Sequence, residues 1–329
     1  MKSTMKKLSV AAMVALFVAA CGGTAASPSG PALTGEIAID GSSTVYPITE
    51  AVAEEFQTAN PGVQVTVAFS GTGGGFKKFC AGEMDANNAS RPIKTSDKPG
   101  DDGVAGTADD VLSEATLCKN AGIEYIELKV AIDALAVVVS KENTFVDCLT
   151  TDELKSIWDL GSVVETWADV RAGWPAEKID LYGPGADSGT FDYFTEVING
   201  EAKRSRSDYT ASEDDNTLVT GISGSQYALG YFGLAYVTEN ADKIRAVEVD
   251  GGKGCTAPSA DAANDGTYVP LGRPLFIYPS VAALARPEVA AFFRFFLENT
   301  NTLSAEVGYI GLNDEDLAAA KAILEGALK

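Results

Sequence analysis

The stretch from Glu36 to Phe69, EIAIDGSSTVYPITEAVAEEFQTANPGVQVTVAF, is the part of the chain that indicates the fold most clearly. Its first residues, Glu36–Asp40, have the pattern of a short strand. Ile48–Asn60 has the periodicity of an amphipathic helix that ends before Pro61, and Val63–Phe69 alternates as a second strand. A strand, a helix and a strand in this order are typical of a βαβ unit, so we predict an α/β sheet protein.

The same alternation continues to the end of the chain without an internal repeat. Further strands are predicted at Glu124–Leu128, Leu135–Ser140, Lys178–Tyr182 and Leu275–Tyr278, and further helices at Thr151–Leu160, Gly189–Asn199, Pro287–Asn299 and Asp314–Leu328. The folded part begins near Gly35. Residues 35–329 reach the size, about 250 to 300 residues, beyond which a single core stops growing, so we expect two lobes.

The N-terminus has the features of an export signal. Three lysines precede an apolar run at residues 8–20, and the run stops at Cys21. It is shorter than the roughly 20 residues of a membrane-spanning helix. A cysteine at this place resembles a bacterial lipobox, so we predict a signal peptide at residues 1–20 and a lipidated Cys21 with a flexible linker at residues 21–35. The alternative is an ordinary signal peptide with a chance cysteine.

Composition excludes several classes of function. A formal net charge of −21 argues against nucleic-acid binding, which needs a basic face. The chain has no histidine, which removes Ser-His-Asp and Cys-His catalysis and every His-based zinc site. Besides Cys21 the chain contains Cys80, Cys118, Cys148 and Cys255. An even number of cysteines in an exported chain favours disulfides over metal binding or catalysis, and three pairings are open.

Four segments share one predicted design, in which a strand is followed by a turn of Gly, Ser and Thr and then by a helix. The first N–H groups of such a helix are free and point toward any anion placed there. We therefore predict anion-binding residues in all four segments: Ser42, Ser43 and Thr44 in the first; Ser70, Gly71 and Thr72 in the second; Ser90 and Arg91 in the third; and Asp187, Ser188, Gly189 and Thr190 in the fourth.

Each segment taken alone has a simpler interpretation. The hydroxyls of residues 42–44 and the carboxylate of Asp187 could merely cap helices, and Arg91 could form a surface ion pair. The second segment matches no nucleotide-binding pattern, because Phe76 takes the place of the last glycine in Gly-x-Gly-x-x-Gly. A further Gly- and Asp-rich segment, Lys98–Asp110, is either a calcium site or a solvated acidic loop, and its spacing does not fit an EF-hand.

Together, four such segments in an exported chain without histidine point to a receptor for an oxyanion. Gly41–Thr44, Ser70–Gly75, Ala89–Pro92 and Asp187–Thr190 resemble the ligand loops of the phosphate-binding proteins that serve phosphate-specific ABC importers. The resemblance extends in order over most of residues 36–329, and it includes the segments Ser212–Asn216 and Arg273–Tyr278.

This resemblance implies a type II periplasmic-binding-protein fold, with two α/β lobes joined by two crossing strands and phosphate in the cleft between them. By the same analogy, lobe I comprises residues 36–132 and 273–329, and lobe II comprises residues 133–272. Cys80 would then pair with Cys118 in the first lobe, and Cys148 with Cys255 in the second. No metal and no cofactor is expected.

The implied function is capture of inorganic phosphate and its delivery to the permease of an ABC importer. We expect a monomer in the periplasm or at the cell surface, held at the membrane only by its lipid. The best-known members carry an Asp after the Ala-Ser pair and an Arg shortly before Ser-Gly-Thr, whereas this chain has Arg91 at the first place and no arginine near the second. Our hypothesis is that Arg91 supplies the main cation and that Asp187 accepts the proton of a hydrogen phosphate.

Three alternatives remain open at this point. The ligand could be another tetrahedral oxyanion such as sulfate or arsenate. The protein could be a phosphate sensor without a permease. An enzyme such as a phosphomonoesterase is weakened by the absence of histidine, although Asp214 and Asp215 could recruit a cation.

Overall fold

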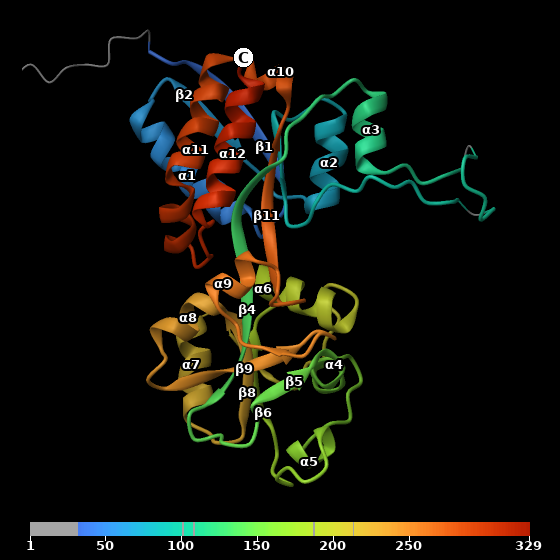
Figure 1. Ribbon diagram of the computed structural model, residues 1–329, viewed down its shortest axis with the longest axis vertical. Helices are drawn as coiled ribbons and strands as arrows, with labels where there is room; N and C mark the ends of the chain where they lie inside the picture. Colours follow the sequence, from blue (N-terminus) through green and yellow to red (C-terminus); the bar gives the residue numbers. More distant parts are fainter. Residues whose placement is uncertain (1–31, 101, 108, 187, 213) are drawn as a thin grey trace, which may run out of the picture. The chain divides into compact units, whose positions relative to one another are not determined.

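The computed structural model describes residues 32–100, 102–107, 109–186, 188–212 and 214–329. The predicted signal peptide, Cys21, most of the linker and Asp187 lie outside these residues. Figure 1 shows the arrangement of the helices and strands.

The strands form one mixed sheet in the order β2, β1, β3, β11, β4, β8, β6 and β7, with β9 beside β4 and with β5 and β10 beside β9. β1 is parallel to β2 and β3, so the carboxyl ends of these three strands meet at one edge. The strands are β1 Gly35–Gly41, β2 Val63–Val67, β3 Ala86–Ala89, β4 Leu128–Ser140, β5 Cys148–Thr150, β6 Asp180–Pro184, β7 Thr210–Ser212, β8 Ala228–Gly233, β9 Ile244–Asp250, β10 Cys255–Thr256 and β11 Gly272–Pro279.

Helices connect most of these strands, as the alternating pattern predicts. They are α1 Tyr46–Ala59, α2 Thr72–Cys80, α3 Glu114–Asn120, α4 Thr151–Trp158, α5 Trp167–Val170, α6 Gly189–Phe194, the π-helical η1 Thr195–Asn199, α7 Asp215–Ser223, α8 Leu234–Glu239, α9 Ala260–Asn264, α10 Val281–Leu284, α11 Pro287–Glu306 and α12 Asp314–Ala327. The α/β class predicted from the sequence is confirmed.

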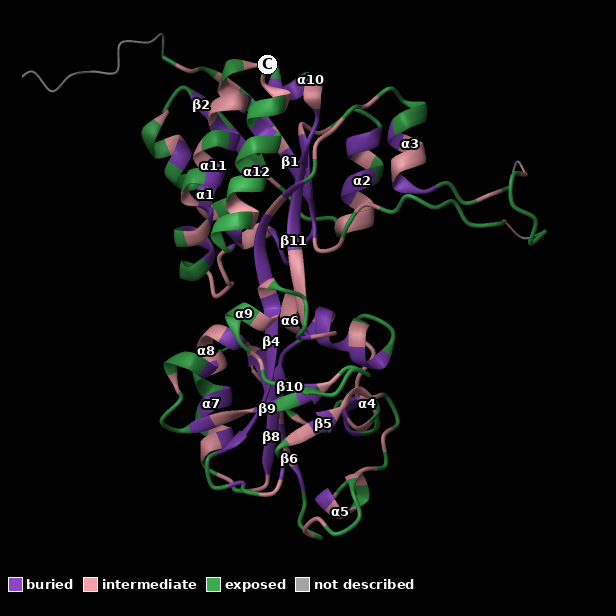
Figure 2. Cartoon of the chain, viewed as in Figure 1, coloured by how far each residue is buried: buried purple, intermediate pink, exposed green. Residues whose placement is uncertain are grey.

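Two sets of apolar cores lie along the sheet. The first set packs α1, α11 and α12 against β1, β2 and the first half of β4, and packs α2 and α3 against β3 and β11. The second set lies around the second half of β4 together with β8 and β9. β4 and β11 run side by side from one set to the other, and both are largely buried (Figure 2). The fold therefore consists of two α/β lobes joined by two crossing strands.

The structure differs from the predicted elements in several places, and in two of them the kind of element changes. Residues Glu124–Leu128 do not form a strand of their own, because pairing there is limited to a bridge between Tyr125 and Ser280, and β4 begins only at Leu128. The helix predicted over Gly189–Asn199 is α-helical only to Phe194 and continues as η1.

Two disulfides join the cysteines in the expected pairs, Cys80 with Cys118 and Cys148 with Cys255. Over the described ranges, no helix has both the length and the apolar character that crossing a membrane requires.

The Gly- and Asp-rich segment forms a long excursion between β3 and α3. Its two arms pair through an antiparallel bridge between Lys98 and Val111. Asp102 Oδ1 accepts a hydrogen bond of 2.8 Å from the Val104 N–H, and Asp110 Oδ2 accepts one of 2.6 Å from Gly106. Within the described part of the chain, no group of three or more Asp, Glu, His or Cys side chains is placed to hold a metal ion. These contacts do not test the choice between a calcium site and a solvated acidic loop at this segment.

Candidate functional site

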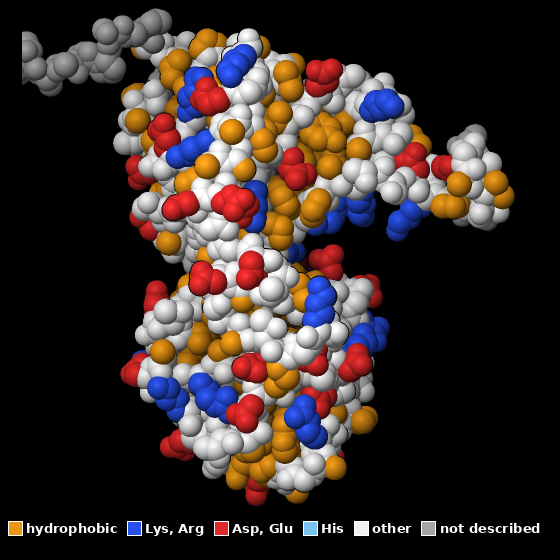
Figure 3. Space-filling model, in the orientation of Figure 1, with side chains coloured by type: hydrophobic (Ala, Val, Ile, Leu, Met, Phe, Trp, Pro, Cys, Tyr) orange, Lys and Arg blue, Asp and Glu red, His pale blue; other side chains and the backbone are white. Residues whose placement is uncertain are grey.

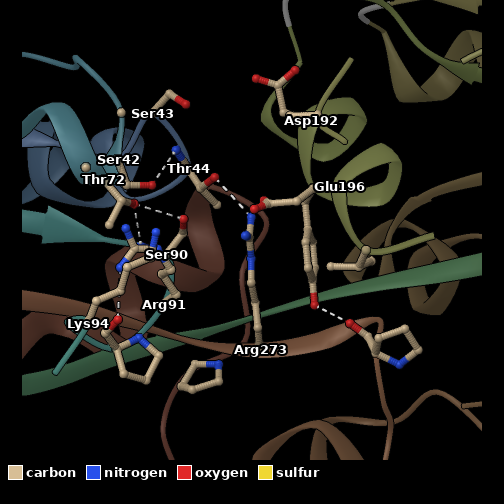
Figure 4. A pocket seen from close by; sticks show the side chains of 18 of the residues that line it. Ser42, Ser43, Thr44, Thr72, Ser90, Arg91, Lys94, Asp192, Glu196 and Arg273 are labelled. Carbon is tan, nitrogen blue, oxygen red and sulfur yellow. Dashed lines mark hydrogen bonds between the residues drawn. The ribbon is translucent and has the colours of Figure 1, made fainter. Parts of the chain in front are cut away.

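A cavity of about 540 Å³ lies at the carboxyl ends of β1, β2 and β3, where open sheets of this kind bind ligands. Figure 4 shows it from close by, with hydroxyl side chains and Arg91 on one side and Asp192 and Glu196 on the other. The described residues that line it are Ser42, Ser43, Thr44, Gly71, Thr72, Gly73, Ser90, Arg91, Pro92, Lys94, Asp192, Tyr193, Glu196, Val197, Ala202, Pro270, Gly272, Arg273 and Pro274.

The first predicted segment lies on the cavity wall between β1 and α1. The N-cap of α1 is Val45, with no side-chain cap, so the interpretation of residues 42–44 as a helix cap is wrong. Instead, Ser42 Oγ accepts a hydrogen bond of 3.2 Å from the Thr44 N–H. The turn needs glycine at residue 41, because its φ is 132° and a Cβ there would lie 2.1 Å from the carbonyl oxygen of Asn88.

In the second segment, Gly71 and Thr72 line the cavity and Ser70 does not. α2 begins at Thr72, so the run of three glycines lies inside the helix and not in a loop before it. A Cβ on Gly75 would lie 2.5 Å from Gly41 Cα, which means that this glycine lets α2 pack closely on β1. The need for glycine at Gly75 therefore arises from helix packing and not from contact with a ligand.

The third segment contributes Ser90 and Arg91, but no helix follows it directly. β3 ends at Ala89, and the next helix in the chain is α3, which begins at Glu114. The expectation of a strand, turn and helix is therefore wrong here, because the long excursion of residues 93–112 intervenes. The Ser90 N–H donates a hydrogen bond of 3.2 Å to Thr72 Oγ1, which joins the second and third segments.

Arg91 is part of an ion pair and also part of the cavity wall. Its Nη1 and Nη2 contact the two carboxylate oxygens of Glu114 at 2.9 and 2.6 Å. Burial alone would raise the pKa of Glu114, but hydrogen bonds from Arg91 and from the Lys94 backbone outweigh it and hold the pKa below its ordinary value. Both partners are therefore charged at neutral pH, and the Arg91 side chain is 31% exposed.

Arg273, in β11, is a cation of the cavity that sequence reasoning did not select. It lies opposite Asp133 in the ladder between β11 and β4, and its Nε donates to Asp133 Oδ2 at 3.2 Å. Its Nη2 donates to Thr44 Oγ1 at 3.2 Å, and its guanidinium lies 3.5 Å from the centre of the Tyr193 ring. A signal existed, since Arg273 opens one of the segments that carry the family resemblance.

The opposite wall is acidic and was also missed. Asp192 and Glu196 lie in α6 and η1, four residues apart, and both line the cavity. Burial raises the pKa of Asp192, and Glu196 adds to the shift, while Lys203 opposes it. Asp192 Oδ1 is buried and has no hydrogen-bond partner among the described residues, although Lys203 Nζ lies 3.9 Å away. Nothing in the local sequence pattern distinguishes these two carboxylates from an ordinary solvated helix face.

The fourth segment lies beside the cavity, and its described residues are not on the wall. Ser188 caps α6 by accepting a hydrogen bond from the Thr190 N–H at 3.2 Å. A Cβ on Gly189 would lie 3.6 Å from Thr44 Oγ1, so the start of α6 approaches the first segment. Asp187 lies outside the described residues. The ligand roles of Asp187, Ser188, Gly189 and Thr190 stay predictions.

The chemistry of the cavity suits a small oxyanion. Among its described lining residues, three side chains are cationic and two are acidic, namely Arg91, Lys94 and Arg273 against Asp192 and Glu196. Five Ser and Thr side chains add their hydroxyls: Ser42, Ser43, Thr44, Thr72 and Ser90. On the face of the molecule drawn in Figure 3, basic and acidic side chains are interspersed. With a formal net charge of −21, the local donors and not the overall charge would attract an anion.

The cation site considered at Asp214 is not supported by its surroundings. Asp214 is the N-cap of α7, and its carboxylate accepts a hydrogen bond of 2.9 Å from the Asn216 N–H. A role in capping the helix accounts for this residue.

Comparison with known proteins gives consistent matches. Residues 26–300 match the family model of the PBP superfamily domain. The chain is 46% identical over 287 residues to Protein SphX of Synechococcus elongatus, covering 86% of this chain and 80% of that protein. It is 36% identical over 315 residues to the phosphate-binding protein PstS of Staphylococcus saprophyticus, covering 94% of this chain and 90% of that protein.

A solved structure is also similar. The crystal structure of a possible phosphate binding protein from Planctomyces limnophilus matches with a TM-score of 0.82 and 51% identity, covering 90% of this chain and 100% of that chain. From the lobes, the cavity and these matches together, we conclude that the chain belongs to the PBP superfamily and, within it, to the family of PstS-like phosphate-binding proteins.

Proposed function

We propose that this protein captures inorganic phosphate in the cavity and delivers it to the permease of an ABC importer. The observation that carries the proposal is the combination of five Ser and Thr hydroxyls with the guanidinium groups of Arg91 and Arg273 around one cavity. Hydroxyl and N–H donors can replace the water around a phosphate, and planar guanidinium groups match the geometry of its oxygens. Membership in a family that includes proteins named for phosphate binding supports this assignment.

Selection for phosphate needs a hydrogen-bond acceptor as well as donors. A hydrogen phosphate carries a proton that a carboxylate can accept, whereas a fully ionised sulfate would leave that carboxylate buried and unpaired beside an anion. We assign this role to Asp187, which directly precedes Ser188 and the start of α6.

Closure of the two lobes on the ligand is the remaining part of the mechanism. We take lobe I as residues 36–132 and 273–329 and lobe II as residues 133–272, with β4 and β11 as the hinge. Phosphate would stabilise the closed arrangement by binding it better than the open one. The protein carries out no chemical step and acts as a binding component, held outside the cytoplasm by a lipid on Cys21.

Isothermal titration calorimetry of the purified protein with phosphate, sulfate and arsenate at two pH values tests the proposal. We expect tight binding of phosphate and rejection of sulfate, and the Asp187→Asn variant should lose part of this discrimination. Absence of heat with phosphate would overturn the function. Continued rejection of sulfate by the variant would remove only the role of Asp187.

A further inference from the structure

Glu114 accepts hydrogen bonds from the guanidinium of Arg91 on the side that faces away from the cavity. Glu114 is 8% exposed and does not line the cavity itself. In addition to its two contacts with Arg91, its Oε2 accepts a hydrogen bond of 2.9 Å from the backbone N–H of Lys94. One carboxylate therefore holds both the side chain of Arg91 and the backbone that follows it.

This pairing leaves part of the guanidinium for a ligand. Nη1 contacts Glu114 and the carbonyl oxygen of Pro92, and Nη2 contacts Glu114. These bonds use at most three of the five N–H groups of an arginine. The Nε–H and one N–H of Nη2 have no hydrogen-bond partner among the described residues. Glu114 thus orients Arg91 without occupying all of its donors.

A disulfide holds the helix that carries Glu114. Cys118 lies four residues after Glu114 in α3 and is bonded to Cys80, the last residue of α2. Cys80 Sγ lies 3.4 Å from the carbonyl oxygen of Glu114. Both cysteines are buried, at 4% and 0% exposure. The disulfide therefore fixes the position of Glu114 relative to α2.

The other end of α2 reaches the cavity. Thr72, the first residue of α2, lines the wall, and its Oγ1 lies 3.2 Å from both the backbone nitrogen and the Oγ of Ser90. Ser90 directly precedes Arg91. The contacts thus form a closed ring that runs from Arg91 through Glu114, the disulfide, α2, Thr72 and Ser90 back to Arg91.

We propose that Glu114 and the Cys80–Cys118 disulfide are positioning groups of the anion site, which hold Arg91 in the orientation that binds phosphate. The inference rests on the proposed function. The second disulfide is a natural contrast, because it joins β5 to β10, and neither strand contributes a described residue to the cavity wall. Phosphate affinity should therefore depend on the first disulfide and not on the second.

The test compares phosphate affinity and melting temperature in two double variants, Cys80→Ala/Cys118→Ala and Cys148→Ala/Cys255→Ala. We expect the first to bind phosphate about tenfold more weakly and the second to bind within about twofold of the wild type. The second disulfide spans 107 residues and the first spans 38. Loss of the second should therefore lower the melting temperature at least as much as loss of the first. Stability would then fall in both variants, and phosphate affinity only in the first.

A double-mutant cycle with Arg91→Ala shows whether the effect passes through Arg91. In that background, removing Cys80 and Cys118 should cost clearly less phosphate affinity than it does in the wild type, because there is no guanidinium to orient. Glu114→Gln provides a second cycle if the cysteine variant fails to fold, and we expect it to weaken binding only when Arg91 is present.

Separate outcomes decide the inference and the proposed function. Wild-type affinity in the Cys80→Ala/Cys118→Ala variant would overturn the positioning role, as would an equal loss with and without Arg91. A wild-type protein that releases no heat with phosphate would overturn the proposed function and this inference together.

Discussion

Arg273 lies where β4 and β11 pair as they pass between the two lobes, and its contacts explain why a charged pair is tolerated in this buried position. Burial raises the pKa of Asp133, and the charge of Arg273 and its hydrogen bond oppose that shift. The side chains of Arg273 and Asp133 are only 15% and 6% exposed. Removing one partner of such a pair leaves the other as an uncompensated buried charge.

For this pair we predict that Asp133→Ala lowers the free energy of unfolding by about 3 kcal/mol, because Arg273 loses its buried partner. Urea unfolding followed by circular dichroism measures the change. Glu325→Ala is the matched control, since the Arg294–Glu325 pair is about half exposed, at 47% and 51%, and should change stability little. Equal losses in both variants would contradict the importance assigned to burial.

Among the structural elements, α2 shows how a sequence motif can serve packing and binding at once. The glycine run lies in the first turns of this helix, where Gly75 faces β1 and Gly74 faces Ser70. A Cβ on Gly75 would lie 2.0 Å from Asn87 Oδ1, and Asn87 is fully buried. A Cβ on Gly74 would meet only Ser70, with Oγ at 3.0 Å and Cβ at 3.3 Å. The hydroxyl can rotate away, and the Cβ of Ser70 has to move by only a few tenths of an ångström.

We therefore predict that Gly75→Ala lowers the free energy of unfolding by about 1 to 3 kcal/mol through overpacking and also weakens phosphate binding, because α2 carries Thr72 to the cavity. Gly74→Ala should be tolerated, with a small gain in helix propensity. Urea unfolding and calorimetry on both variants decide the point. If the two variants behave alike, close packing of α2 on β1 is not what requires glycine at residue 75.

Over the whole molecule, the carboxyl groups set the response to acid. The described carboxyl groups with a lowered pKa are Asp40, Asp97, Glu114, Glu153, Asp159, Asp169, Asp208, Asp265 and Glu325, and those with a raised pKa are Asp133 and Asp192. The hydrogen bond from Arg206 is the main cause that lowers the pKa of Asp208 to about 2. Each group with a lowered pKa binds its proton more weakly in the folded chain than in the unfolded one, so these groups favour the folded chain as long as they are ionised.

We predict that stability is fully present above about pH 5 and falls as the pH drops through the ordinary pKa of Glu, 4.5, and of Asp, 3.8, toward the lower folded values. The free energy of unfolding, measured in urea at pH 7, 5, 4 and 3, should decrease over the last three points. Glu114→Gln should show a shallower decrease, because one of the groups with a lowered pKa is gone. An increase in stability toward pH 3 would contradict the prediction.

A feature of the fold or of the candidate site could be predicted from the sequence when it depends on residues that are neighbours in the chain. The βαβ pattern of Glu36–Phe69 predicts β1, α1 and β2 closely, because strand and helix periodicity are properties of neighbouring residues. Helix boundaries were less predictable. The first turns of α2 contain three glycines, which favour a loop by propensity, and the packing of Phe76 and Phe79 in the core keeps them helical.

By itself the sequence determined the α/β class, the exclusion of histidine chemistry and seven cavity residues: Ser42, Ser43, Thr44, Gly71, Thr72, Ser90 and Arg91. These follow from composition, periodicity and motifs that are contiguous in the chain. Only the tertiary structure brought Arg273 to Thr44, Glu114 to Arg91, and Asp192 and Glu196 to the facing wall. Such contacts join residues distant in sequence, and their geometry depends on how β4 and β11 cross and how α3 packs on α2.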